Sequence, residues 1–171
     1  GVHSLGANTT GASNTALGYQ SLTANTTASN NTAVGQNALV ANTTGNLNIA
    51  VGNESLATNT VGDRNVAMGY QALTTFNPDS NVDAYNTAMG HASLKSLTTG
   101  TKNTAIGGLA METATTGVDN TALGYGALYA NTTASNNTAV GKSALGATTT
   151  SGVNTAVGAL ALTTNTTGGR L

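Results

Sequence analysis

The residues best suited to metal chemistry lie in one short segment of the chain. Asp79, Asn81 and Asp83 occupy alternate positions, and oxygen ligands at every second residue are typical of a Ca²⁺-binding loop. The segment departs from that pattern in two places. Ala84 stands where the loop glycine is expected, and Gly90 stands where the bidentate glutamate is expected. The sequence therefore leaves two interpretations open, a Ca²⁺ site and a plain insertion of the kind that a surface loop tolerates.

No other set of residues predicts chemistry. His3 and His91 stand alone, and the chain contains no cysteine. The spacing of the serines does not indicate a Ser-His-Asp triad. We therefore expect no enzymatic activity, no catalytic residues and no cofactor apart from the Ca²⁺ considered above.

Paired threonines recur along the chain and offer a different kind of surface. A flat threonine ladder is similar to the ice-binding face of solenoid antifreeze proteins. The neighbouring Asn and Gly residues instead favour polar turns. Both interpretations stay open. The pairs are Thr9-Thr10, Thr26-Thr27, Thr43-Thr44, Thr98-Thr99, Thr115-Thr116, Thr132-Thr133, Thr149-Thr150 and Thr166-Thr167.

Two further surface features follow from composition. Tyr19, Tyr70 and Tyr125 each follow a repeated glycine, and we expect them on the outer face, where they could form a stripe that contacts carbohydrate. Acceptor triplets for N-glycosylation are also frequent, as any chain rich in Asn and Thr produces by chance. They begin at Asn8, Asn25, Asn30, Asn42, Asn53, Asn131, Asn136 and Asn165.

The element that must position these residues is a repeat with the signature Asn-x-Ala-x-Gly. The steps between copies are 17 residues long, except for one step of 21 residues from Asn65 to Asn86. A short fixed period is typical of one structural unit stacked on itself. The repeated asparagines are expected to form an amide ladder. They are Asn14, Asn31, Asn48, Asn65, Asn86, Asn103, Asn120, Asn137 and Asn154.

Within each repeat the residues favour a short strand. Thr15-Ala16-Leu17 shows the pattern of a β-branched residue, an alanine and a medium apolar residue before the glycine. Strand alternation puts Thr15 and Leu17 on one face and Ala16 on the other. We expect the Leu/Val face to fill the interior and the Ala/Gly face to be covered by another copy of the chain. A second short strand is expected around Ser21-Leu22.

Together these patterns predict an all-β fold, a parallel β-solenoid (β-roll) of about ten 17-residue rungs. Residues 1–171 are expected to form one repetitive domain, with an inserted loop near 76–85 and no separate caps. The interior of such a thin coil is small and no disulfide is available, so association between copies is the expected source of stability. A net charge of -1 without a basic patch argues against nucleic acid, and no apolar run reaches membrane-spanning length.

The repeats at 14–22 and 120–128 resemble the head-domain repeat of trimeric autotransporter adhesins and the repetitive shaft of bacteriophage tail fibres. The resemblance covers essentially the whole chain. It implies a homotrimeric parallel β-roll at a cell surface, a virion surface or another extracellular location, with a role in attachment. The expected function is thus a structural surface fibre or adhesin segment. The expected partners are further copies of the chain, which could also join end to end into a filament, and a host-surface or carbohydrate receptor. The alternative is an ice-binding β-solenoid.

Overall fold

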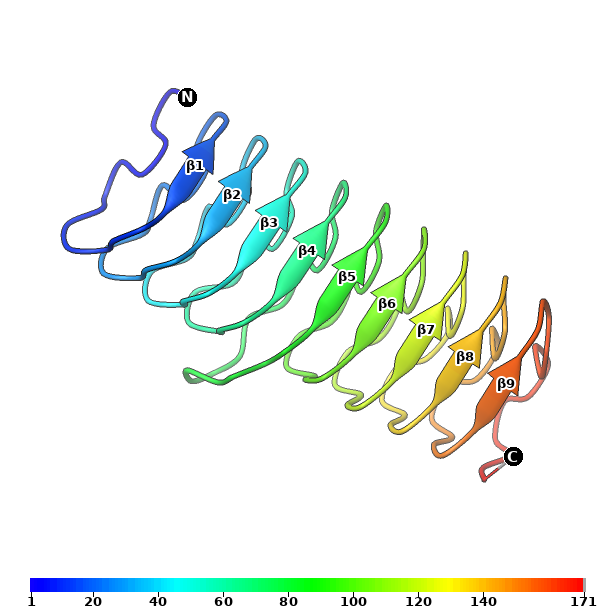
Figure 1. Cartoon of the computed structure of the whole chain (residues 1–171). Helices are drawn as coiled ribbons and strands as arrows, with labels where there is room; N and C mark the ends of the chain where they lie inside the picture. Colours follow the sequence, from blue (N-terminus) through cyan, green and yellow to red (C-terminus); the bar gives the residue numbers. More distant parts are fainter. Residues whose placement is uncertain (171) are drawn as a thin grey trace.

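The computed structural model describes residues 1–170, which wind into a parallel β-solenoid without a helix among them (Figure 1). Each strand is three residues long, and the strands pair in chain order into one parallel nine-stranded sheet. The strands are β1 (Thr15–Leu17), β2 (Thr32–Val34), β3 (Ile49–Val51), β4 (Val66–Met68), β5 (Thr87–Met89), β6 (Thr104–Ile106), β7 (Thr121–Leu123), β8 (Thr138–Val140) and β9 (Thr155–Val157).

The register confirms the 17-residue repeat as the structural unit. Ala33 of β2 pairs with Ala50 of β3, and the same residue of each strand pairs with its equivalent along the sheet. The longer step does not disturb this register, because Ala67 of β4 still pairs with Ala88 of β5. Nine strands form in the described residues, against the expected count of about ten rungs.

The two faces of the strands are the reverse of the prediction. The alanines, such as Ala33 and Ala105, are fully buried inside the coil, whereas Leu17 is 63% exposed and Val157 is 70% exposed. The expectation that the Leu/Val face fills the interior was therefore wrong. Alternation fixes which side chains share a face but not which face points inward. The inward face must also hold the buried asparagines. A small alanine beside them leaves room for the leucine that lies four residues after the repeated glycine.

That leucine enters the core from a turn and not from a second strand. Leu22 and its equivalents at 39, 56, 73, 94, 128 and 145 are fully buried. Leu22 has a φ of 51°, and Gln20 two residues earlier has a φ of 56°, so both adopt the left-handed conformation. The Leu22 N–H still donates to the Ala38 carbonyl of the next rung at 3.1 Å. The predicted strand around Ser21-Leu22 is thus a hydrogen-bonded turn that points a leucine inward.

The repeated glycine ends each strand at a corner that only glycine fits. Gly107 has a φ of 131°, and a Cβ built on it would lie 2.6 Å from the backbone of Gly124 in the next rung. An L-residue would therefore be strained by its backbone conformation and would also collide with the neighbouring rung. The stacking of rungs and the recurrence of glycine have the same steric cause.

Candidate functional site

The expected metal ligands do not converge in the structure. The guanidinium of Arg64 forms an ion pair with Asp83, and Asn81 donates to the Asp63 carboxylate at 3.4 Å. Asp79 is exposed. The described residues contain no group of three or more His, Cys, Asp or Glu side chains that could hold a metal ion. The Ca²⁺ prediction stays untested, but the Asp83 carboxylate already has a cationic partner.

The insertion that carries these residues is packed onto the coil. The N–H of Asp63 donates to the Val82 carbonyl at 2.9 Å, and the N–H of Ala84 donates to the Asp63 carbonyl at 3.1 Å. Ala84 and Phe76 are fully buried. Residues 79–81, at the tip, are the only three consecutive exposed residues of the insertion. The extra residues thus form a short bulge whose two ends keep the hydrogen bonding of the neighbouring rungs.

The two histidines lie against aromatic rings in the neighbouring rung. His91 stacks on Tyr70 with ring centroids 5.5 Å apart, and His3 meets Tyr19 edge-on at 6.3 Å. These contacts link successive turns: Tyr19, Tyr70 and His91 directly follow a repeated glycine, and His3 lies two residues after Gly1. They place the histidines on the outer surface as packing partners of tyrosines.

The repeated asparagines form one column on the inner side of the coil. In the middle of the column, the Asn103 side-chain oxygen accepts hydrogen bonds from the backbone N–H and the side-chain amide of Asn120, both at 3.1 Å. The side-chain amide of Asn103 donates to the Gly117 carbonyl at 2.8 Å. Each interior asparagine thus bonds its own rung to the next one, and also ties the strand to the return segment of the coil.

A second asparagine column was missed by sequence reasoning. The side-chain amide of Asn25 donates to the Asn8 oxygen at 2.7 Å, and Asn42 and Asn59 continue the ladder at 3.2 and 3.0 Å. Phe76 then takes the position of the next asparagine, and Leu97 follows it, both fully buried. These apolar replacements break the sequence pattern and hide the column, although Asn-Thr-Thr recurs on both sides of the break.

This second column changes the expectation for glycosylation. Asn25, Asn42 and Asn131 are fully buried in hydrogen-bonded ladders or turns, so the folded chain cannot present them as acceptors. Asn30 and Asn136 are exposed. Asn8, Asn53 and Asn165 are half-buried, so burial excludes only the three triplets that begin at Asn25, Asn42 and Asn131.

The threonine pairs lie on bends and not on the flat sheet. In six of the eight pairs the hydroxyl of the first threonine donates to a backbone carbonyl of the next rung. For example, the Thr26 Oγ1 donates to the Thr43 carbonyl at 3.2 Å, and the Thr115 Oγ1 donates to the Thr132 carbonyl at 3.0 Å. The second threonine, for example Thr116, is exposed. This placement matches the polar-turn interpretation. The second threonines of the pairs form a single exposed column.

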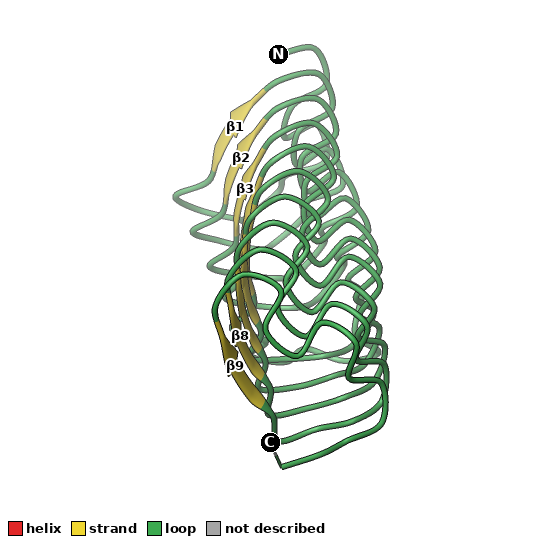
Figure 2. Cartoon of the chain, turned by 90° about the vertical axis from the view of Figure 1, so that its right-hand side faces the viewer, coloured by secondary structure: helices red, strands yellow, loops and turns green. Residues whose placement is uncertain are grey.

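The outer side of the sheet is a repetitive surface that runs along all nine strands. We call it the strand face, defined as the side chains at the first and third positions of β1 to β9. Figure 2 shows these strands following one side of the coil along its length. The strand face carries no charged residue. Its large exposed apolar side chains are Leu17, Ile49, Met68, Met89, Ile106, Leu123 and Val157, each at least 36% exposed.

Comparison with known proteins gives no match to a family model, to a curated protein or to a solved structure. Within the described residues, no helix is long and apolar enough to cross a membrane. Functional interpretation of this chain therefore depends on its own geometry.

Proposed function

We propose that this chain is a structural segment of an extracellular fibre or adhesin, a rod that associates with copies of itself through the strand face. The observation that carries the proposal is the strand face itself, which is uncharged and repeats an apolar side chain in all nine strands. Eight inter-strand steps of about 4.8 Å give this surface a length of about 40 Å. A continuous apolar surface is uncommon on monomeric proteins and is typical of interfaces.

A second copy of the same chain is the partner whose chemistry fits best. Every copy presents its apolar column, with a column made mostly of threonine beside it, at the same spacing and in the same register, so parallel copies can pack rung against rung. Closed rotational symmetry is the common outcome when identical surfaces meet. The resemblance to trimeric repeats favours three copies around one axis, with the strand faces directed toward it and the turns directed outward.

The interior supports a mechanical role. Asparagine hydrogen bonds cross from rung to rung, and the sheet hydrogen bonds run parallel to them. Bending the rod would lengthen bonds in several columns together. This arrangement supports a stiff spacer whose outward turns repeat along its length and offer many equivalent contacts to a surface.

Sedimentation equilibrium tests the proposal. The expected mass is three times the 16.7 kDa of one chain. A double variant with Met89→Lys and Ile106→Lys places two charges on the strand face and should sediment as a monomer. A control with Thr116→Lys and Thr133→Lys adds the same charge on exposed bends and should keep the wild-type mass. A wild-type chain that remains monomeric at high micromolar concentration would overturn the proposal.

One observation favours ice binding as a second candidate. Five successive strands, from β5 to β9, begin with an outward threonine on the flat sheet: Thr87, Thr104, Thr121, Thr138 and Thr155. A regular threonine array beside an apolar column suits a face that orders water. Thermal hysteresis in a monomeric sample, lost on Thr104→Lys and kept on Thr116→Lys, would support this function over self-association.

A further inference from the structure

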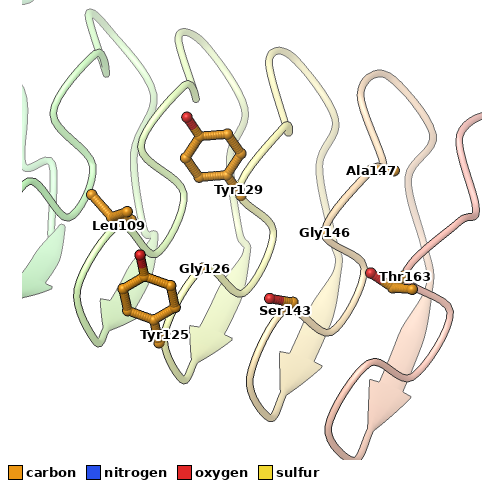
Figure 3. Close-up of a pocket in the computed structure, with 8 residues that line it drawn as sticks. All are labelled: Leu109, Tyr125, Gly126, Tyr129, Ser143, Gly146, Ala147 and Thr163. Carbon is orange, nitrogen blue, oxygen red and sulfur yellow. The ribbon is translucent and has the colours of Figure 1, made fainter.

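A shallow groove lies on the turn side of the coil, in the rungs of β6 to β9 (Figure 3). Its volume is about 410 Å³, and Leu109, Tyr125, Tyr129, Ser143, Gly146 and Thr163 contribute to its lining. Figure 3 shows the Tyr125 and Tyr129 rings on the same turn, beside the smaller residues of the next two rungs. We call this depression the tyrosine groove. It contains no residue of the strand face.

The groove exists because bulky and small residues meet in neighbouring rungs. Tyr129 is followed in its column by Gly146, and Tyr125 is followed in the chain by Gly126. Tyr125 also lies beside Gly108 of the preceding rung, where an added Cβ would approach the tyrosine ring to 3.5 Å. Glycines therefore leave both rings uncovered. The sequence Tyr-Gly-x-x-Tyr occurs at 125–129 and nowhere else in the chain.

The lining combines aromatic surface with hydroxyl groups and carries no charged side chain. Tyr125 is 56% exposed and Tyr129 is 41% exposed, so their rings are open to a ligand. Ser143 and Thr163 place hydroxyls across the groove from them. Outside the lining, the carboxylate of Glu112 in the preceding rung raises the pKa of the Tyr129 phenol, chiefly through its negative charge.

These features select one class of ligand. A sugar ring has an apolar C–H face, which packs on aromatic rings, and an edge of hydroxyls, which pair with side-chain hydroxyls. A nucleic acid would need cationic side chains, and none lines the groove. A purely apolar ligand would leave the Ser143 and Thr163 hydroxyls without partners. The volume falls in the range of small-molecule sites and suits one or two sugar rings.

We propose that the tyrosine groove binds a neutral saccharide, with Tyr125 and Tyr129 as the stacking platform and Ser143 and Thr163 as hydrogen-bonding partners. This site does not depend on the proposed self-association, because none of its residues lies on the strand face. In an assembly with the turns outward, it would recur once in every copy.

The test is saturation-transfer NMR with four separate probes, D-glucose, D-galactose, D-mannose and N-acetyl-D-glucosamine, each titrated into the full chain at millimolar concentration. We expect saturable transfer to at least one probe. Tyr129→Ala should weaken its binding by roughly tenfold or more, since the ligand loses one aromatic contact. Tyr85→Ala removes an exposed tyrosine that lies neither in the groove nor among the tyrosines that follow the repeated glycines, and it should leave binding unchanged.

A second variant separates loss of the site from loss of the fold. Ala147→Phe fills the groove from its rim and should abolish transfer while the circular dichroism spectrum is kept. Absence of transfer to all four probes, or equal weakening by Tyr85→Ala and Tyr129→Ala, would overturn the proposal. The sedimentation mass measured on the same samples reports on self-association separately, so failure of either proposal can be distinguished from failure of the other.

Discussion

The Asn103→Ala substitution tests the asparagine ladder at its centre. Asn103 is fully buried, and its side chain makes four hydrogen bonds: to the Gly117 carbonyl, to the backbone N–H and side-chain amide of Asn120, and to the Asn86 side-chain oxygen. After truncation, the side-chain amide of Asn120 keeps its bond to the Ala134 carbonyl at 2.8 Å. The Asn120 backbone N–H and the Gly117 carbonyl lose the bonds that Asn103 gives them. The variant therefore leaves two buried polar groups without partners.

The size of the effect follows from those two groups. Leaving a buried donor or acceptor unpaired costs about 1–3 kcal/mol, so the expected loss in unfolding free energy is about 2–6 kcal/mol. Asn53→Ala is the matched control, because Asn53 is only half-buried and its side chain makes no hydrogen bond to the described residues. We expect the control to change stability by less than about 0.5 kcal/mol.

The assay is urea unfolding followed by circular dichroism at one fixed protein concentration, since association also contributes to stability. An Asn103→Ala variant within about 0.5 kcal/mol of wild type would refute the reasoning. So would equal losses for Asn103→Ala and Asn53→Ala. Either result would mean that the ladder bonds contribute no more than the solvent contacts that they replace.

Three further predictions concern the corner, the core and a surface pair. Gly107→Ala should prevent folding or lower the thermal midpoint strongly, because its Cβ would meet the Gly124 backbone at 2.6 Å, whereas Gly108→Ala should be mild, because its Cβ finds the Tyr125 ring at 3.5 Å. Ala105→Leu should destabilise the chain by about 1–3 kcal/mol in the same urea assay, because the fully buried alanine column has no room for a larger side chain. A destabilisation as small as that of Ala147→Leu on the surface would contradict this. Finally, the charge of Glu112 raises the pKa of Tyr129 above the ordinary 10.0. The protonated Tyr129 phenol therefore contributes to the stability of the fold below pH 10, and this contribution is lost as the pH rises through the folded-state pKa. Glu112→Gln should lower that pKa in an ultraviolet titration of tyrosinate, and an unchanged titration curve would disprove the pairing.

The repeat itself was readable from the sequence because stacking demands the same residue at the same place in each rung. Asn14 and its equivalents, the strand triplets and the corner glycines all have this origin, and their period gave the parallel solenoid directly. The inward face was not readable in the same way. Alternation at Thr15-Ala16-Leu17 shows that there are two faces but does not show which one is buried. Hydrophobicity alone selected the Leu/Val face, which is the exposed one.

What decides the inward face is a backbone conformation that composition does not reveal. The left-handed φ values of Gln20 and Leu22 turn the leucine side chain into the coil. The buried leucine leaves room in the interior only for an alanine side chain from the strand. The second asparagine column was hidden for another reason, since Phe76 and Leu97 interrupt it. The tyrosine groove was missed because Tyr129 lies outside the column of tyrosines that follow the corner glycines.

We propose that other copies of the chain cover the strand face. Thiol labelling tests it most directly, because the chain contains no cysteine of its own. Leu123 on the strand face and Tyr125 on the following turn are 45% and 56% exposed in a single chain, so Leu123→Cys and Tyr125→Cys would react at similar rates in a monomer. If other copies cover the strand face, Leu123→Cys is protected from a maleimide reagent in the native assembly while Tyr125→Cys reacts freely. Equal labelling rates for the two variants under native conditions would contradict it.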